Sequence, residues 1–172
     1  MTNWNDIFDL YVGKDKEAKE WMRNPFVNYD NNIWCTDASA ALIVAPYVCG
    51  RGLIVNKEIH KTDIPIVKDM DEWLFVKYYE LRRAVDLCGK EEPSVPYLNG
   101  VRIGNGVYST IQMTRVLKTM QKLNVNTLFV VSEPLEEDAV LFQMKGLCGV
   151  SILQMPMIPK EESKVVELIK IG

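Results

Sequence analysis

The chain has few of the residues from which metal and redox sites are built. It contains one histidine and four cysteines among 172 residues, and no two cysteines have the C-x-x-C spacing of a zinc or thiol-redox site. We therefore predict no bound metal and no cofactor. The cysteines are expected to be free thiols that pack as small apolar side chains.

Long apolar runs are also missing. No segment approaches the roughly 18 apolar residues that a membrane-spanning helix needs. Residues 1–10 contain polar and acidic side chains where a signal peptide would have an apolar core. The sequence therefore predicts a cytoplasmic protein without a membrane segment.

The excess of one charge over the other is small. The chain has 20 Lys and Arg against 23 Asp and Glu, a formal net charge of −3. That balance argues against a protein that coats nucleic acid with its whole surface. It is compatible with a local basic stripe, because one face can be basic while the remainder is acidic. Apolar residues make up 48% of the chain, enough at this length for one hydrophobic core, so we expect a single domain over residues 1–172.

Hydrophobic periodicity and turn residues divide most of the chain into two similar halves, 7–48 and 101–157. In each half the pattern predicts one strand, one helix and three further strands. The expected elements are 7–12, 15–24, 26–29, 33–37 and 41–48 in the first half, and 101–103, 110–123, 127–132, 139–145 and 150–155 in the second. Such a repeat predicts an α+β fold with an antiparallel sheet and both helices on one face of it.

Apolar alternation also predicts which side chains of the second half form its core. The expected core positions are Val116, Leu117, Met120, Leu128, Phe129, Val130, Leu141, Ile152 and Leu153.

Two segments lie outside the repeat. Residues 69–88 predict a long inserted helix, because Asp69 and Glu72 have the spacing of a capping box and Gly89 suits a C-terminal stop. Residues 158–172 are expected to form a tail that is helical over 161–171. The aromatic side chains of the inserted helix are expected to serve the core or an interface; they are Trp73, Phe75, Tyr78 and Tyr79.

Several short motifs of the second half occur in a fixed order. Val101-Arg-Ile-Gly104 precedes the 110–123 helix, Asn124-Val125 follows it, and the last strand ends in Met155-Pro-Met157. This order resembles the C-terminal domain of the bacterial DNA sliding clamp, the beta subunit of DNA polymerase III. In the first half, Trp34-Cys-Thr-Asp37 resembles the Ala-Thr-Asp-Gly strand and turn of the same family.

The resemblance implies a DNA-clamp-like fold and a non-enzymatic role in holding double-stranded DNA or replication proteins. A clamp ring contains six such domains, so a chain with one domain is expected to form a homo-oligomer. In the family, Gly-His-Arg usually follows Thr-Asp and its basic pair faces DNA. This chain has Ala38, Ser39 and Ala40 there. That difference favours an alternative, a clamp-fold protein-interaction module that has lost DNA binding.

The helix after Ser109 is the strongest candidate for a DNA contact. Arg115, Lys118 and Lys122 follow one another at helical spacing, and no acidic residue lies within 110–123. Three cations on one side of a helix suit contact with phosphates without base reading. The alternative is an ordinary solvated helix face.

The expected helix at 15–24 provides a second set of candidate DNA-binding cations. They are interleaved with acidic residues that offset their field, so the alternative here is again a solvated helix face. The cations are Lys16, Lys19 and Arg23, and the acids are Asp15, Glu17 and Glu20.

The remaining polar residues form no catalytic constellation. His60 has no accompanying nucleophile, Asp37 is expected to shape a turn, and the acidic run 136–138 lacks histidine or cysteine partners. We therefore expect no enzymatic activity.

Overall fold

The computed structural model describes residues 2–49, 56–60, 67–91 and 97–169. The strands are β1 (Phe26–Asn28), β2 (Ile33–Thr36), β3 (Ala40–Val44), β4 (Asn56–His60), β5 (Asp69–Lys77), β6 (Gly100–Ile103), β7 (Gly106–Ser109), β8 (Thr127–Ser132), β9 (Val140–Met144), β10 (Val150–Gln154) and β11 (Val165–Ile169). The helices are α1 (Trp4–Asp9), η1 (Glu20–Arg23, a 3-10 helix), α2 (Pro46–Cys49), α3 (Tyr78–Cys88) and α4 (Thr110–Lys122).

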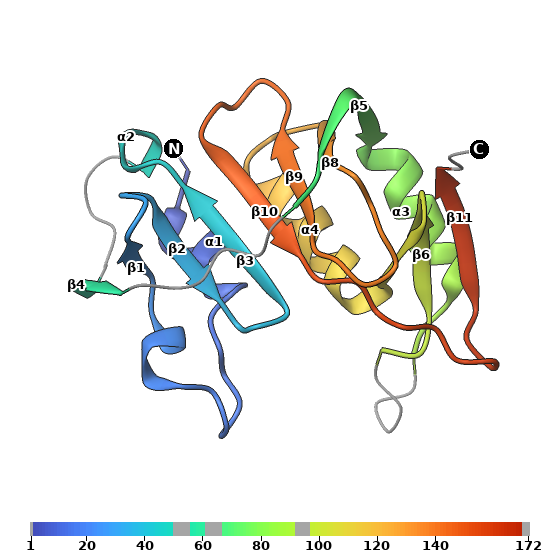
Figure 1. Ribbon diagram of the computed structural model, residues 1–172, viewed down its shortest axis with the longest axis horizontal. Helices are drawn as coiled ribbons and strands as arrows, with labels where there is room; N and C mark the ends of the chain where they lie inside the picture. Colours follow the sequence, from blue (N-terminus) through green and yellow to red (C-terminus); the bar gives the residue numbers. More distant parts are fainter. Residues whose placement is uncertain (1, 50–55, 61–66, 92–96, 170–172) are drawn as a thin grey trace.

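Two sheets organise these elements (Figure 1). Eight strands form a largely antiparallel sheet in the order β4-β1-β2-β3-β10-β9-β8-β5, and a smaller sheet has the order β11-β6-β7. The two halves of the chain join in the larger sheet, where β3 pairs with β10 from Val44–Val150 to Ala40–Gln154. The prediction of an α+β fold built on a large antiparallel sheet is confirmed.

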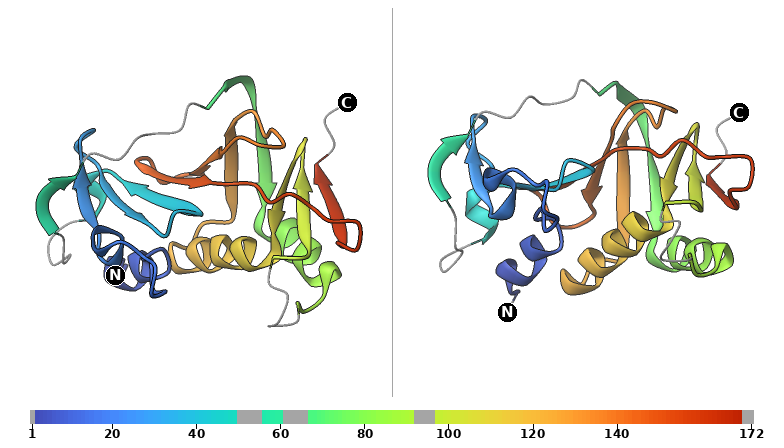
Figure 2. Two further views of the ribbon diagram at one scale, coloured as in Figure 1. Left: turned by 60° about the horizontal axis from the view of Figure 1, so that its bottom comes forward. Right: turned by 90° about the horizontal axis from the view of Figure 1, so that it is seen from below.

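One face of the larger sheet, the inner face, is covered by helices. Figure 2 shows α1, α4 and α3 in a row on one side of the sheet. Ile7 and Phe8 of α1 and Met113 of α4 are buried in one continuous core with Leu42 of β3 and Phe142 of β9. Because side chains alternate along a strand, every second residue of β3 and of β9 belongs to this core.

The opposite, outer face carries a smaller cluster. Phe26, Trp34 and Leu153 are buried there, and Trp21 of η1 packs against them. Leu141 also lies on this face, because its neighbours Val140 and Phe142 in β9 point to the helices, and it is only half-buried. Phe129 is likewise half-buried, so both were wrongly assigned to the core. The other seven expected core positions are buried, as predicted; they are Val116, Leu117, Met120, Leu128, Val130, Ile152 and Leu153.

The structure of residues 4–24 differs from the prediction. The strand expected at 7–12 is replaced by α1, which the Asn3 side chain caps by accepting a hydrogen bond from the Asp6 backbone N–H. The helix expected at 15–24 is a turn followed by η1, held by a hydrogen bond from Gly13 N to Met22 O. Helix α1 thus takes the position on the inner face that was expected for the 15–24 helix.

The segment 69–88 was predicted as one helix and is half strand. Residues of β5 pair with β8, for example Phe75 with Phe129, and Asp69 and Glu72 consequently form no capping box. Val76 is buried while Trp73 and Phe75 are exposed, which is the alternation of a strand. Only α3 is helical, and Gly89 ends it with φ 75°, as the sequence predicts.

The expected strands of the second half are present as β6, β8, β9 and β10, and α4 begins after the expected cap. The Ser109 side chain accepts a hydrogen bond from the Gln112 backbone N–H. Strand β7 was not anticipated, and it makes a hairpin with β6 through Gly104, whose φ is 59°. The described part of the tail, up to residue 169, contains a strand where a helix was expected, because β11 pairs in parallel with β6.

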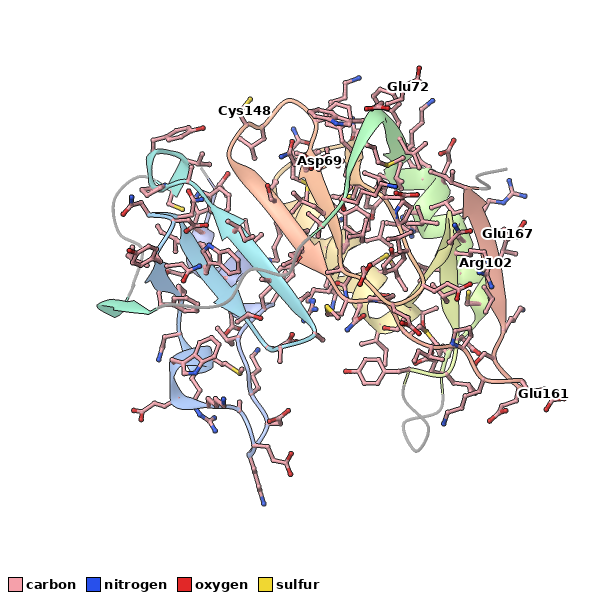
Figure 3. All side chains as sticks on the ribbon, viewed as in Figure 1. Asp69, Glu72, Arg102, Cys148, Glu161 and Glu167 are labelled. Atoms are coloured by element: carbon pink, nitrogen blue, oxygen red, sulfur yellow. The ribbon has the colours of Figure 1, made fainter. Side chains whose placement is uncertain are left out.

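The four cysteines are free thiols. Cys35, Cys49 and Cys88 are buried, as expected for small apolar side chains, and Cys148 is exposed in the loop between β9 and β10 (Figure 3). None of the helices that the structure describes is long and apolar enough to span a bilayer.

Candidate functional site

Helix α4 turns most of its apolar residues toward the sheet, although Thr110, Gln112 and Thr119 are also buried and Ile111 is exposed. Met113, Val116 and Met120 are fully buried against the sheet. On the opposite side Lys118 and Lys122 are exposed, and no acidic side chain occurs in the helix. The sequence therefore located two of the three cations correctly on a solvent-facing surface.

Arg115 has a different environment from the two lysines. Its Nη1 donates a hydrogen bond of 2.7 Å to Asp37 Oδ2, and the two side chains are only 14% and 25% exposed. The guanidinium also lies over the Tyr11 ring, 4.6 Å from its centroid, and Nη1 is 3.4 Å from the Leu10 carbonyl oxygen. Arg115 is thus held by the residues that follow α1 and by the turn after β2, and its Nη2 donates to Ser39 Oγ at 3.5 Å.

The turn that presents Asp37 is fixed by its own side chains. Asp37 Oδ1 accepts hydrogen bonds from Ser39 N, Ser39 Oγ and Ala40 N at 2.9, 2.6 and 3.1 Å. Ala38 has φ 75°, a left-handed conformation that favours glycine. The expectation that Asp37 shapes a turn through side-chain to backbone bonds is confirmed.

The surroundings of Asp37 keep its carboxylate charged. Burial by itself raises the pKa of Asp37, but the Arg115 charge and the hydrogen bonds from Ser39 outweigh burial and hold the pKa below its ordinary value. The carboxylate and the guanidinium therefore form a stable ion pair at neutral pH.

Tyr11 connects α1 to α4 beside this ion pair. Thr119 Oγ1 donates to the Arg115 carbonyl oxygen at 2.8 Å, so it accepts a 2.7 Å hydrogen bond from the Tyr11 hydroxyl. Burial raises the pKa of Tyr11 to about 12, and the hydroxyl stays protonated.

A buried amide pair joins the same region to β10. Gln154 Nε2 donates to Gln112 Oε1 at 2.6 Å and to the Ser39 carbonyl oxygen at 3.3 Å. Sequence reasoning missed Tyr11, Gln112 and Gln154, because their partners are remote in the chain and no local pattern marks them.

A surface depression of about 430 Å³ opens where the end of α1, the Asp37 turn and α4 meet. We refer to it as the α1–α4 pocket. Lys14, Arg115 and Lys118 supply cations to its wall, and Ile111 and Tyr97 supply apolar surface. Lys14 forms an exposed ion pair with Asp9, at 3.0 Å.

The segment 15–24, which carries the second predicted set of cations, does not form a helix beside α4. Lys16 and Lys19 are exposed in the turn before η1, and Arg23 Nη2 donates to the carbonyl oxygens of Asp15 and Ala18. Because Trp21 of η1 packs on the outer face of the sheet, η1 is not part of the helical layer on the inner face.

The acidic run 136–138 and His60 lie in different parts of the fold. The residues 136–138 lie in the turn between β8 and β9, and His60 ends β4. In the part of the chain that the structure describes, no group of three histidine, cysteine or carboxylate side chains could hold a metal ion.

Comparison of the chain with family models, with curated proteins and with solved structures gives no match. The function is therefore inferred from the residues and geometry of the chain itself.

Proposed function

We propose that this chain is a non-enzymatic, clamp-like domain that contacts the phosphate backbone of double-stranded DNA through α4, without reading base sequence. The observation that carries the proposal is the exposed, acid-free face of α4 with Lys118 and Lys122. Lysines one turn apart can contact successive phosphates as point charges. A protein of net charge −3 can bind DNA in this way only over a limited patch.

Two features support the clamp-like part of the proposal. Helices α1 and α4 both lie on one face of an antiparallel sheet (Figure 2). Ala38, with φ 75°, adopts a glycine-like conformation at the position where the clamp pattern has glycine after Thr-Asp. A ring of six domains would require about six copies of the 19.7 kDa chain, a mass that sedimentation analysis can measure.

The ion pair with Asp37 changes the role that the proposal gives to Arg115. Its guanidinium positions α4 against α1 and the Asp37 turn, and the exposed lysines make the DNA contacts. With two phosphate contacts per domain, affinity should be weak and sequence-independent.

Charge reversal tests the proposal directly. Lys118→Glu with Lys122→Glu should abolish binding to a fluorescent DNA duplex at low salt. The matched control is Lys160→Glu with Lys164→Glu, which changes net charge equally at two exposed lysines outside α4. Equal loss of binding in both double variants would show a general charge effect and would contradict a specific role of α4.

A second function, protein interaction without DNA binding, is favoured by one observation. Trp73 and Phe75 are 48% and 56% exposed on β5, and both rings contact Phe129 on the outer face. Exposed aromatic groups of this kind are enriched in protein interfaces. This alternative replaces the first if the wild-type protein shows no retention on duplex DNA at low salt.

A further inference from the structure

The α1–α4 pocket has the properties of a small-ligand site. Its volume of about 430 Å³ lies within the roughly 300–1,000 Å³ typical of such sites. It combines convergent polar groups with exposed apolar side chains, and it lies at the junction of four separate segments, since Tyr97 comes from the segment before β6. Of the residues that line it, the proposed DNA contact uses only Lys118.

The charges in the pocket favour an anion. Lys14, Arg115 and Lys118 line it together with one carboxylate, that of Asp37. Both oxygens of that carboxylate are already occupied by Arg115, Ser39 and Ala40. Lys118 has a free ammonium in the described part of the chain, and Lys14 can leave its exposed pair with Asp9 at little cost.

The geometry of Arg115 selects between the common anions. A carboxylate ligand binds arginine best through two parallel N–H donors. Here Nη1 is committed to Asp37 and Nε is buried, which leaves only Nη2 toward Ser39 and the pocket. A phosphate group, which accepts single hydrogen bonds from several point donors, suits Nη2 and two lysine ammonium groups better.

The apolar part of the pocket indicates a ligand with more than a phosphate. Ile111 is 45% exposed and Tyr97 is 51% exposed, and both border the pocket. An aromatic or aliphatic body lying across them would remove apolar surface from water, which contributes to affinity.

We propose that the α1–α4 pocket binds a small phosphorylated molecule with an aromatic or aliphatic body, such as a nucleoside monophosphate. Lys14, Lys118 and Arg115 Nη2 contact the phosphate, while Ile111 and Tyr97 contact the body. This site goes beyond DNA contact by α4, because it engages Lys118 and leaves Lys122 outside.

Calorimetric titration with adenosine monophosphate, adenosine and inorganic phosphate tests this assignment. Adenosine monophosphate should bind more tightly than either of the other two. Lys118→Glu should weaken its binding roughly tenfold or more, as expected for loss of a charge-assisted hydrogen bond. Lys122→Glu is the matched control on the same helix, and it should change the affinity less than about twofold. Ile111→Ser should weaken binding of adenosine monophosphate and leave that of inorganic phosphate unchanged.

Several results would overturn the assignment. Wild-type protein that shows no binding at millimolar ligand has no such site. Equal effects of Lys118→Glu and Lys122→Glu would indicate general attraction to the helix. If adenosine binds as tightly as adenosine monophosphate, the phosphate is not recognised. If inorganic phosphate binds as tightly as adenosine monophosphate, the aromatic or aliphatic body is not recognised. The proposed contact with duplex DNA requires both lysines. If duplex DNA instead displaces adenosine monophosphate and its binding depends on Lys118 but not on Lys122, the occupant of the pocket is a phosphate of nucleic acid.

Discussion

Arg115 connects parts of the chain that are far apart in sequence. Its guanidinium contacts the Asp37 carboxylate, the Tyr11 ring and the Leu10 carbonyl oxygen. Because both charged groups of the ion pair are mostly shielded from water, removing one partner leaves the other poorly solvated. The residue therefore stabilises the junction of α1, α4 and the Asp37 turn.

The ion pair makes stability depend on pH in a defined direction. Asp37 has a folded-state pKa below its ordinary value, so its contribution is fully present above the unfolded pKa of about 4 and is lost as pH falls through the lower folded value. Asp37→Asn should lower the free energy of unfolding by about 1–3 kcal/mol at neutral pH. Urea unfolding of both proteins should show this difference shrinking in acid. A difference that stays constant down to about pH 2.5 would contradict the charge-based explanation.

Backbone conformation at Ala38 gives a second residue-level prediction. A residue with a β-carbon has an unfavourable energy at φ 75°, and glycine does not. Ala38→Gly should therefore raise the free energy of unfolding by about 1 kcal/mol, measured by urea denaturation. Ala41→Gly, within β3, is the control and should lower it. Destabilisation by both changes would mean that Ala38 is not strained.

At the scale of elements, local signals predicted α4 and β8 to β10 because cap residues, periodicity and tertiary packing agree there. Residues 4–11 contain four apolar side chains at the spacing of a helical stripe, namely Trp4, Ile7, Phe8 and Tyr11. The apolar residues of 7–12 alone favoured a strand, so the helix was not predicted. In residues 69–77, pairing with β8 overrides a local capping pattern.

Some residues of the candidate site could likewise be predicted from local sequence, and others depend on contacts between remote parts of the chain. Helical periodicity alone predicts that Lys118 and Lys122 face solvent. The partner of Arg115 could not be predicted, because Asp37 is 78 residues away and only the fold brings them together.

The buried face of α4 makes a testable contribution to the core. Leu117 is buried against the sheet, and Leu117→Ala should lower the free energy of unfolding by about 2–5 kcal/mol through lost burial and a cavity. Gln121→Ala, on the exposed face of the same helix, should change it by less than about 0.5 kcal/mol. A loss below about 1 kcal/mol for Leu117→Ala would mean that α4 packs differently.

At the scale of the whole molecule, the helices cover one face of a continuous sheet, and the described residues of the other face form a smaller cluster. The two faces therefore offer different surfaces. The inner side presents the lysines of α4, and the outer side presents the aromatic rings of β5. Contact with DNA and contact with a protein can thus be separated by variants on opposite faces.

The salt dependence of DNA binding tests contact through α4 most directly. Each phosphate contact contributes a slope of about 0.9 to the fall of log affinity with log salt, so Lys118 and Lys122 together should contribute about 1.8 per chain. Fluorescence anisotropy over a range of salt concentrations should show the slope decreasing by about 0.9 for Lys118→Gln and again for Lys122→Gln. Lys160→Gln should leave it unchanged. Absence of binding by the wild-type protein at low salt, or a slope that neither α4 change reduces, would contradict DNA contact through this helix.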